Sequence, residues 1–281
     1  MVQKSGSKTA TVFLGGGRIT SALCSGLRLG RYKSDLVVYD RNPSKLRALR
    51  RESGVEIARD LKSAIERAHM LILAVRPASV LGLLDEIARS GIAPGLCVSL
   101  AAGVPLSTLR RSAGAVRWVR AMPSPVCRIG RGLTAITFDR AVTRIQRRQV
   151  REFFSIVGQV IEIPERQFDA FTAAYSSSHG YHALATLASQ AQRAGLDRMT
   201  ALTAAAHALA DGIAYWRESG LGLKELLHEA ATPGGIAAAT MQAMDRTGYP
   251  NVVAKGIQAG IQQAERNAKD SAQRSTGRHV L

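Results

Sequence analysis

The chain has 281 residues, of which 46% are hydrophobic and 21% are charged, and its formal net charge at pH 7 is +17. This composition is ordinary for a globular protein and excludes a disordered, collagen-like or disulfide-dense chain. The length allows one large or two modest domains with a buried core. The apolar runs are too short to span a bilayer, so we expect no membrane association.

The positive charge is concentrated in the first part of the chain. Residues 1–163 carry 27 Lys and Arg against 11 Asp and Glu, whereas residues 164–281 carry 11 against 10. Most of these basic residues are arginines on helix-like segments such as 144–151, without interleaved aromatic residues, and the sequence contains none of the common DNA- or RNA-binding motifs. We therefore expect no specific nucleic-acid partner and interpret the basic half as suited to a polyanionic cofactor.

The start of the chain and its cysteines indicate a compartment. Met1 to Lys8 form a short polar stretch without the apolar segment of a secretory signal. The cysteines Cys24, Cys97 and Cys127 are odd in number and widely spaced, a pattern typical of neither a disulfide framework nor a metal cluster. We expect a cytoplasmic protein in a reducing environment.

Near the N-terminus, an apolar run at residues 11–14 ends at three consecutive glycines, and a helix-compatible segment follows. This is the strand, turn and helix that a dinucleotide site requires. Gly15 permits the tight turn, Gly17 lets the backbone approach a pyrophosphate, and a helix that begins near Arg18 presents free N–H groups to that anion. Thr20 occupies the place of the third glycine of G-x-G-x-x-G, so a plain glycine-rich hairpin is the alternative interpretation.

A second predicted strand, at 35–39, leads into Asp40 and Arg41, where Rossmann units place the residues that contact the ribose. An acid there accepts hydrogen bonds from the 2′-hydroxyl of NAD, whereas an arginine pairs with the 2′-phosphate of NADP. More arginines follow close behind. We favour NADPH over NADH as the cofactor. The alternative is that Asp40 is a turn residue and that the arginines form a solvated helix face.

The rest of the first half alternates between strand and helix patterns. This alternation predicts an α/β fold with a parallel sheet and helices on both faces, and the close spacing of the later strands predicts an antiparallel edge without clear helices. The predicted strands are 10–14, 35–39, 70–75, 96–100, 116–119, 133–138 and 159–163. The predicted helices are 18–29, 43–52, 60–67, 78–89 and 105–112.

From about residue 165 the sequence becomes rich in alanine, with apolar residues at helical spacing. We expect a Rossmann-type NAD(P)-binding domain over 1–164 and an all-helical domain over 165–281. Because residues 199–214 are apolar around much of the helix circumference, we predict a homodimer or larger oligomer through residues 165–270. The predicted helices are 168–193, 198–218, 223–229 and 250–269, followed by a polar tail that we expect to be disordered.

Short motifs occur in order along nearly the whole chain. They are Gly15, Gly17, Ile19 and Ala22 in the first turn, Ala74–Pro77, Ser99–Gly103, Arg120–Pro125, Asp169–Thr172 and Pro233–Gly235. They are similar to the G-x-G-x-M-x-x-A, A-V-K-P, S-x-x-A-G, R-x-M-P-N-x-P, D-x-x-T and P-G-G segments of the pyrroline-5-carboxylate reductases. In order and spacing the chain resembles that family.

The resemblance implies a Rossmann-type domain followed by a helical domain like that of 6-phosphogluconate dehydrogenase. It also implies an NAD(P)H-dependent oxidoreductase that acts on the C=N bond of a cyclic imine, by default 1-pyrroline-5-carboxylate, in proline biosynthesis. The cofactor-binding residues would be Gly15, Gly17, Arg18, Ile19, Arg41, Ala74, Val75, Arg76, Pro77 and Ala101.

The chain departs from the family where the substrate is thought to bind. The family's G-S-G-P-A-Y segment, which is thought to hold the substrate carboxylate, is Ser176-Ser-Ser-His-Gly-Tyr181 here, and Ala237 replaces a threonine that follows P-G-G. The serines add hydroxyl donors but lose the backbone freedom of glycine. The residues carried over as substrate-binding are Ser176, Ser178, Gly234, Gly235 and Ile236, and the catalytic candidates are Ser177 and His179.

His179 replaces the family's proline and has two interpretations. It could protonate the imine nitrogen as the hydride arrives, or hold a substrate anion as a cation. Alternatively, it caps the helix and fills the space left by the proline. A metal pair with His182 lacks a third ligand at suitable spacing, so we expect no metal.

Two alternatives to proline formation remain open. The departures at Ser176–His179 and Ala237 favour a different cyclic imine or carbonyl in a specialised pathway, and loss of the family's residues could also leave a catalytically inactive nucleotide-binding protein. The related β-hydroxyacid dehydrogenases use a lysine on the interdomain helix. No lysine occurs between Lys62 and Lys224, which argues against that chemistry.

Overall fold

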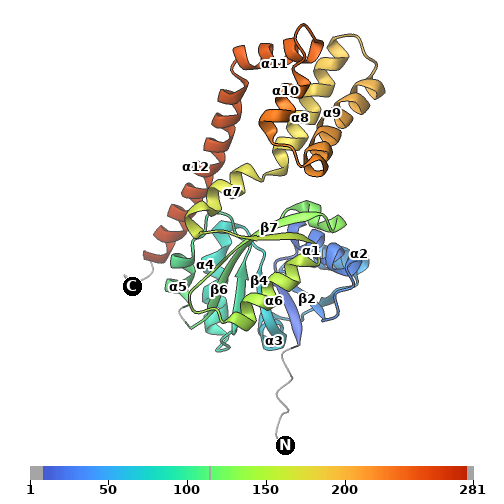
Figure 1. Ribbon diagram of the computed structural model, residues 1–281. Helices are drawn as coiled ribbons and strands as arrows, with labels where there is room; N and C mark the ends of the chain where they lie inside the picture. The colour runs from blue at the N-terminus through green and yellow to red at the C-terminus, as the bar shows by residue number, and fades with distance from the viewer. Residues whose placement is uncertain (1–8, 114, 277–281) are drawn as a thin grey trace, which may run out of the picture. The chain divides into compact units, whose positions relative to one another are not determined.

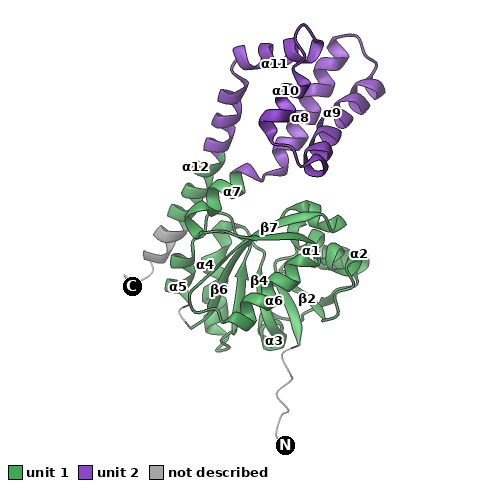
Figure 2. Cartoon of the chain, viewed as in Figure 1, with its two compact units in different colours: residues 1–173, 260–281 green, residues 174–259 purple. Residues whose placement is uncertain are grey.

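The computed structural model describes residues 9–113 and 115–276. Contacts within the chain divide it into two compact units (Figure 2). The sheet unit contains the described residues up to Ala173 and those from Gly260 onward, and the helical unit contains residues 174–259.

Eight strands form one sheet in the sheet unit: β1 (Ala10–Leu14), β2 (Leu36–Tyr39), β3 (Glu56–Ile57), β4 (Ala68–Leu73), β5 (Leu96–Ser99), β6 (Arg117–Met122), β7 (Gly132–Phe138) and β8 (Gly158–Glu162). Their order is β3-β2-β1-β4-β5-β6-β7-β8 (Figure 1). Neighbouring strands are parallel except β6 and β7, so the expected antiparallel edge is confirmed. The direction of strand addition reverses between β1 and β4, which is the switch point where such sheets bind ligands.

Helices cover both faces of this sheet, which confirms the predicted α/β class: α1 (Arg18–Leu29), α2 (Pro43–Ser53), α3 (Leu61–Arg67), α4 (Val80–Arg89), α5 (Leu106–Ser112) and α6 (Arg144–Ser155). α1, α2 and α6 share one apolar cluster with Phe13 of β1, whereas α3, α4 and α5 share a second cluster with Val12 and Leu14. Successive β1 residues therefore enter opposite cores, as expected for a strand buried on both faces.

Two elements of the sheet unit are absent from the sequence-based prediction. β3 pairs only two residues with β2, too few for a strand pattern. α6 lies between β7 and β8, where we predicted no clear helix. Its arginines dominate the segment, and only Val150, Phe153 and Phe154 are buried, so the apolar stripe is narrow. Helical character was visible in 144–151, but its place between two strands was not.

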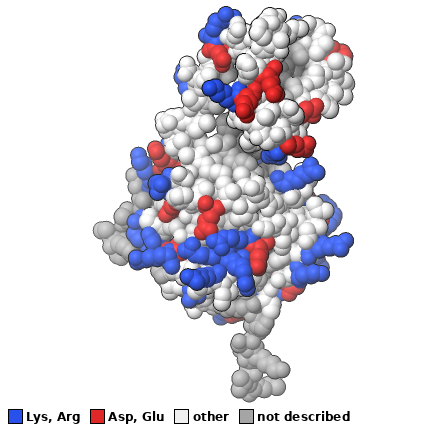
Figure 3. All heavy atoms as spheres, in the orientation of Figure 1, with Lys and Arg blue, Asp and Glu red and all other residues white. Residues whose placement is uncertain are grey.

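The basic charge is spread over the sheet unit, whose exposed face in Figure 3 shows many Lys and Arg side chains. On α6, Arg147 and Arg151 both pair with Glu162 of β8, and their guanidinium carbons lie 4.8 and 5.4 Å from the centre of the Phe138 ring. These arginines pack on the sheet. Arg147 and Arg151 therefore add to the positive charge without lining the pocket, whose basic residues are Arg41, Lys45 and Arg76.

The remaining helices are α7 (Phe168–Ala174), α8 (Ser177–Arg193), α9 (Arg198–Ser219), α10 (Leu223–Ala230), α11 (Ile236–Arg246) and α12 (Tyr249–Thr276). The predicted helix over 168–193 is wrong as one element, because the chain breaks at Tyr175 and Ser176 caps α8. α11 was not predicted, and it begins directly after a double glycine. None of the described helices is long and apolar enough to cross a membrane.

The helical unit buries little of its own apolar surface. Its buried described residues are Ala188, Ala201, Ala205 and Ala238. In contrast, large side chains of α9 stay open to solvent, with Ile213 exposed by 52%, Tyr215 by 55% and Trp216 by 43%. Large apolar side chains exposed in this way are typical of an interaction face and agree with the expected oligomer contact through this helical region.

The C-terminal helix runs further than predicted. α12 extends to Thr276 instead of ending at residue 269, so the first part of the expected disordered tail is helical, and residues 277–281 lie outside the described residues. Its part from Gly260 onward packs with the sheet unit, as α7 does up to Ala173. The domain boundary expected between residues 164 and 165 stays a prediction.

Candidate dinucleotide site and substrate segments

A pocket of about 520 Å³ lies in the sheet unit at the carboxyl ends of β1, β2 and β4, which is the switch point of the sheet. The turn after β1, residues 39–41 after β2 and residues 74–76 after β4 contribute to its wall. Gly82, Leu83 and Glu86 of α4 also line it. Three strand ends and one helix therefore surround a space of a size suited to a cofactor.

The glycine turn is shaped by close packing against the end of β4. Gly15 has a φ of +111°, a conformation that favours glycine, and a Cβ added there would lie 2.6 Å from the carbonyl oxygen of Ala74. Thr20 is buried and its hydroxyl donates to the carbonyl of Gly15 at 2.6 Å. The residue at the third glycine position thus supports the turn through its side chain.

Gly17 differs from Gly15 because open space surrounds it. A Cβ added to Gly17 would have no heavy atom within 4 Å, and Gly17 is the N-cap of the twelve-residue helix α1. The first N–H groups of a helix lack intrahelical partners and favour an anion. The turn therefore presents backbone donors that a pyrophosphate can approach without meeting a side chain.

Asp40, directly after β2, is tied to the backbone around it. Its Oδ2 accepts a hydrogen bond from Gly16 N at 2.7 Å, and its Oδ1 accepts one from Asn42 N at 2.7 Å. Lys45 Nζ lies 3.8 Å from Oδ2, and the Asp40 side chain is only 14% exposed. Asp40 therefore joins the glycine turn to the start of α2, where Asn42 is the N-cap.

Arg41 stands in a different environment, with 74% of its side chain exposed. Its guanidinium donates to the carboxylate of Glu86 on α4, and both residues line the pocket. The hydrogen bond to Glu86 raises the pKa of Arg41 above its ordinary value, although an arginine is charged at physiological pH without that bond.

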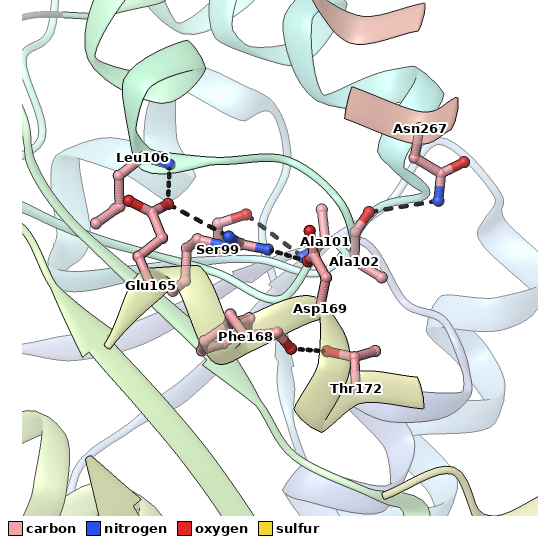
Figure 4. Close-up of polar contacts among 10 residues, drawn as sticks. Ser99, Ala101, Ala102, Leu106, Glu165, Phe168, Asp169, Thr172 and Asn267 are labelled. Carbon is pink, nitrogen blue, oxygen red and sulfur yellow. Dashed lines mark hydrogen bonds and ion pairs between the residues drawn. The ribbon is translucent and has the colours of Figure 1, made fainter. Parts of the chain in front are cut away.

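A buried arginine lies beside the strand ends. Arg120 of β6 has a side chain only 2% exposed, and its Nη1 and Nη2 lie 3.3 Å from Glu165 and 3.1 Å from Asp169. Its guanidinium carbon also lies 4.3 Å from the centre of the Phe168 ring. Figure 4 shows Glu165 and Asp169 directed toward the same group. This ion pair cluster attaches α7 and the residues before it to the sheet.

The loop between β5 and α5 is held from two sides (Figure 4). Glu165 accepts a hydrogen bond from Leu106 N at 2.6 Å at the start of α5. From α12, Asn267 donates to the carbonyl of Ala102 at 3.5 Å, and a Cβ added to Gly103 would lie 2.3 Å from the carbonyl oxygen of Ala264. The loop that follows β5 is therefore packed closely within the sheet unit.

In the helical unit, the serine segment forms the start of α8. Ser176 is the N-cap, and its Oγ accepts a hydrogen bond from Ser178 N at 3.4 Å and lies 2.6 Å from Ser178 Oγ. His179 N donates to the Ser176 carbonyl at 3.1 Å. Ser176, Ser178 and His179 are exposed, and Ser177 is half-buried. Hydroxyls and helix N–H groups thus share one exposed helix terminus, an arrangement that favours an anion.

The late glycine turn forms the start of α11. Gly234 has a φ of +76°, Gly235 is the N-cap, and Ile236, the first helical residue, is 88% exposed. The hydroxyl of Thr240, the nearest possible substitute for the family's threonine, donates to the carbonyl of Ile236 at 2.9 Å. That hydroxyl is therefore engaged within its own helix.

Comparison with known proteins identifies the family. The family model for pyrroline-5-carboxylate reductase dimerisation matches residues 165–267, and the model for NADP oxidoreductase, coenzyme F420-dependent, matches residues 11–103. The pyrroline-5-carboxylate reductase of Corynebacterium melassecola is 30% identical over 268 residues, covering 93% of this chain and 99% of that protein. The chain belongs to the pyrroline-5-carboxylate reductase family. The enzyme of that name from Mycobacterium leprae (strain TN) is 32% identical, covering 90% of this chain and 95% of that protein.

Solved structures agree with this family's fold. The pyrroline carboxylate reductase of Plasmodium falciparum with NADP bound has a TM-score of 0.84 at 19% identity, covering 92% of this chain and 98% of that one. At this identity the likeness concerns the fold alone. It agrees with the predicted Rossmann-type domain followed by a helical domain.

The structure brings together six of the ten predicted cofactor residues of this family member. Gly15, Gly17, Arg41, Ala74, Val75 and Arg76 all line the pocket. Outside that lining, Arg18 and Ile19 lie in the first turn of α1, Pro77 begins a 3-10 helix, and Ala101 is buried in the loop after β5. Sequence reasoning missed Lys45 and Glu86. No local signal marks Glu86, because its partner Arg41 is 45 residues away in the chain.

The cysteines do not supply a reactive group. All three are buried free thiols, and burial raises the pKa of Cys24 and of Cys127 to about 12 and also raises that of Cys97. They therefore stay protonated at neutral pH. Across the described part of the chain, His, Cys, Asp and Glu side chains form no group of three or more that could hold a metal ion.

Proposed function

We propose that this protein is an NAD(P)H-dependent oxidoreductase that reduces the C=N bond of 1-pyrroline-5-carboxylate to form L-proline. Similarity to pyrroline-5-carboxylate reductases over about nine-tenths of the chain carries the proposal. The pocket at the switch point supports it, because a glycine turn open to a ligand backbone is what a dinucleotide needs.

The residues of the pocket fit an NAD(P)H molecule. Gly17 and the N–H groups at the start of α1 would bind the pyrophosphate, and Arg41 and Lys45 would bind a 2′-phosphate, which favours NADPH and leaves NADH possible. Ala74 to Arg76 would line the nicotinamide side. When bound, the cofactor supplies the hydride, and the protein's part is to bind and orient the reactants.

The helical unit supplies the substrate residues in this proposal. Imine reduction adds a hydride to the carbon and a proton to the nitrogen. The substrate carboxylate would bind at the start of α8, where Ser176, Ser177 and Ser178 would add hydroxyl donors to the positive end of the helix dipole. His179 would donate the proton, and Gly234 to Ile236 would complete the substrate-binding set.

The active form is a homo-oligomer in this proposal, and we infer a homodimer through residues 165–270. The dimerisation model matches residues 165–267, and the helical unit exposes Ile213, Tyr215 and Trp216 on α9. The buried free cysteines fit a reducing compartment, and a cytoplasmic location stays a prediction.

A second candidate keeps the cofactor and changes the substrate to another cyclic imine or carbonyl. It is favoured by the engagement of Thr240 within α11, because no hydroxyl replaces the family's threonine at Ala237. The experiment follows NADPH oxidation by the purified protein with 1-pyrroline-5-carboxylate, 1-pyrroline and a six-membered imine acid, and assays proline as product. Turnover with proline formation supports the first candidate. Turnover on another imine alone supports the second, and cofactor binding without any turnover indicates a catalytically inactive nucleotide-binding protein.

Replacement of His179 by alanine tests its role as proton donor. We expect His179→Ala to lower turnover by roughly 10²–10⁴-fold while leaving the Kd for NADPH unchanged, because only proton transfer is lost. Steady-state kinetics and cofactor titration measure both quantities. His182→Ala is the matched control, since His182 is also exposed on α8. Its Nδ1 lies 3.3 Å from Thr186 Oγ1 within the same helix. If both variants keep the turnover of the wild type, His179 is a helix-capping residue and not the proton donor.

A further inference from the structure

The wall of the pocket formed by the residues after β2 and by α2 and α4 holds four charged side chains. Asp40 and Arg41 follow β2, Lys45 comes from α2 and Glu86 from α4. The charges pair as Lys45 with Asp40 and Arg41 with Glu86. This wall therefore has two carboxylates and two cationic side chains. A cofactor phosphate that binds here competes with the carboxylates for the cations.

The carboxylate of Asp40 is already hydrogen bonded to the backbone. Both carboxylate oxygens of Asp40 accept a backbone hydrogen bond, from Gly16 N and from Asn42 N, each at 2.7 Å, and the side chain is 14% exposed. Lys45 also offsets its charge at 3.8 Å. Asp40 therefore holds the turn in place, and its bonds to the backbone limit its capacity to select NADH by accepting ribose hydroxyls.

The carboxylate of Glu86 pairs with Arg41, the residue that would bind a 2′-phosphate. Arg41 is 74% exposed and so is free to change its rotamer, and Glu86 is 30% exposed at the wall of the same pocket. A guanidinium binds a carboxylate and a phosphate with the same fork of N–H donors. A 2′-phosphate that reaches Arg41 must therefore displace the carboxylate of Glu86 or share the guanidinium with it, whereas a 2′-hydroxyl leaves the pair intact.

We propose that Glu86 is a specificity-determining residue, which sets the relative affinity for NADPH and NADH by occupying Arg41 in place of the 2′-phosphate. The inference rests on the proposed function, because it assumes that this pocket binds a nicotinamide dinucleotide. Glu86 favours NADH in two ways: it must give up Arg41 when the phosphate binds, and it repels the phosphate charge. Arg41 alone would give a stronger preference for NADPH than the intact pair allows.

The test is a calorimetric titration of the full-length protein with NADPH, NADH, adenosine 2′,5′-bisphosphate and 5′-AMP. We expect Glu86→Gln to tighten binding of NADPH and of the bisphosphate by about threefold to tenfold, and to change the Kd of NADH and 5′-AMP by less than about twofold. Asp85→Asn is the matched control, because it removes one negative charge from the adjacent position of α4, outside the pocket wall. It should leave all four Kd values unchanged.

A third variant tests whether the gain passes through Arg41. Measured against Arg41→Gln alone, Glu86→Gln combined with Arg41→Gln should gain less affinity for the 2′-phosphate ligands than Glu86→Gln gains against the wild type, because only the repulsion between Glu86 and the phosphate is then relieved. Melting temperatures within a few degrees of each other establish that the variants fold. Equal tightening of NADPH and NADH by Glu86→Gln, or no tightening of either, overturns the inference while the proposed function stands. A wild-type protein that binds neither dinucleotide overturns both.

Discussion

Replacement of Gly15 by alanine is expected to abolish tight dinucleotide binding and to destabilise the sheet unit. The φ of Gly15 is +111°, and an alanine Cβ would lie 2.6 Å from the Ala74 carbonyl oxygen, too close for any non-bonded contact. Backbone strain of this kind costs about 1–3 kcal/mol, and the displaced β4 end adds to it. We expect the Kd for NADPH to rise more than about tenfold, as 1.4 kcal/mol corresponds to one decade. The variant should unfold at a temperature several degrees below that of the wild type.

Gly17→Ala is the matched control for that experiment. A Cβ there meets no heavy atom within 4 Å, and the φ of Gly17 is −82°, which any residue adopts. The variant should melt within a few degrees of the wild type, since the poorer capping by alanine costs only about 1 kcal/mol and no backbone strain or steric clash is added. Its methyl group points into open space where we propose that the pyrophosphate binds, so NADPH affinity should still fall. Equal stability of the two variants would contradict the role of Gly15 in the close approach to β4.

Removal of Arg120 is the second substitution with a large expected effect. Arg120→Met keeps an apolar stem but leaves Glu165 and Asp169 without their shared cation, and those side chains are 35% and 33% exposed. Breaking a buried ion pair costs about 3–5 kcal/mol, and access of water to both acids reduces the expected loss to roughly 2–4 kcal/mol. For a unit of this size that lowers the melting temperature by about 5–15 °C.

Arg148→Met is the control for Arg120, because both changes remove one arginine charge. Arg148 is 73% exposed and pairs with Glu152 four residues away at 3.6 Å, and a pair of this kind contributes about 0.3–0.5 kcal/mol. Thermal unfolding at equal protein concentration compares the two, since melting of an oligomer depends on concentration. A melting temperature for Arg120→Met within 2 °C or so of the Arg148→Met value would contradict a structural role for the buried pair.

The parts of the fold with strong local signals were predictable. The apolar run into Gly15, the alternation of strands and helices and the antiparallel edge all follow from periodicity and turn residues, and β1 and α1 have the predicted bounds. α6 was not predicted as a helix between two strands, because its buried apolar residues are limited to Val150, Phe153 and Phe154 among many arginines. The break between α7 and α8 depends on Ser176 acting as a cap inside an alanine-rich run.

The candidate site was predictable only where its residues follow strand ends. Gly15, Arg41 and Ala74 lie within two residues of the ends of β1, β2 and β4, so topology alone gathers them at the switch point. Glu86 lies within α4, and its meeting with Arg41 depends on how that helix packs against the sheet. The association of Arg120 with Asp169, 49 residues later, is likewise a tertiary contact that links two motifs seen separately in the sequence.

The two ends of the helical unit lie next to each other. A Cβ added to Gly260 would lie 2.9 Å from the Cβ of Ala173, so the chain leaves the sheet unit and returns to it at neighbouring points. Residues 174–259 therefore have the geometry of an insertion with adjoining ends. A connection of about 2–5 residues joins neighbouring helices, so one deletion could close the sheet unit without rerouting its backbone. In evolutionary terms, the helical unit could be exchanged as a single genetic cassette while the nucleotide pocket is retained.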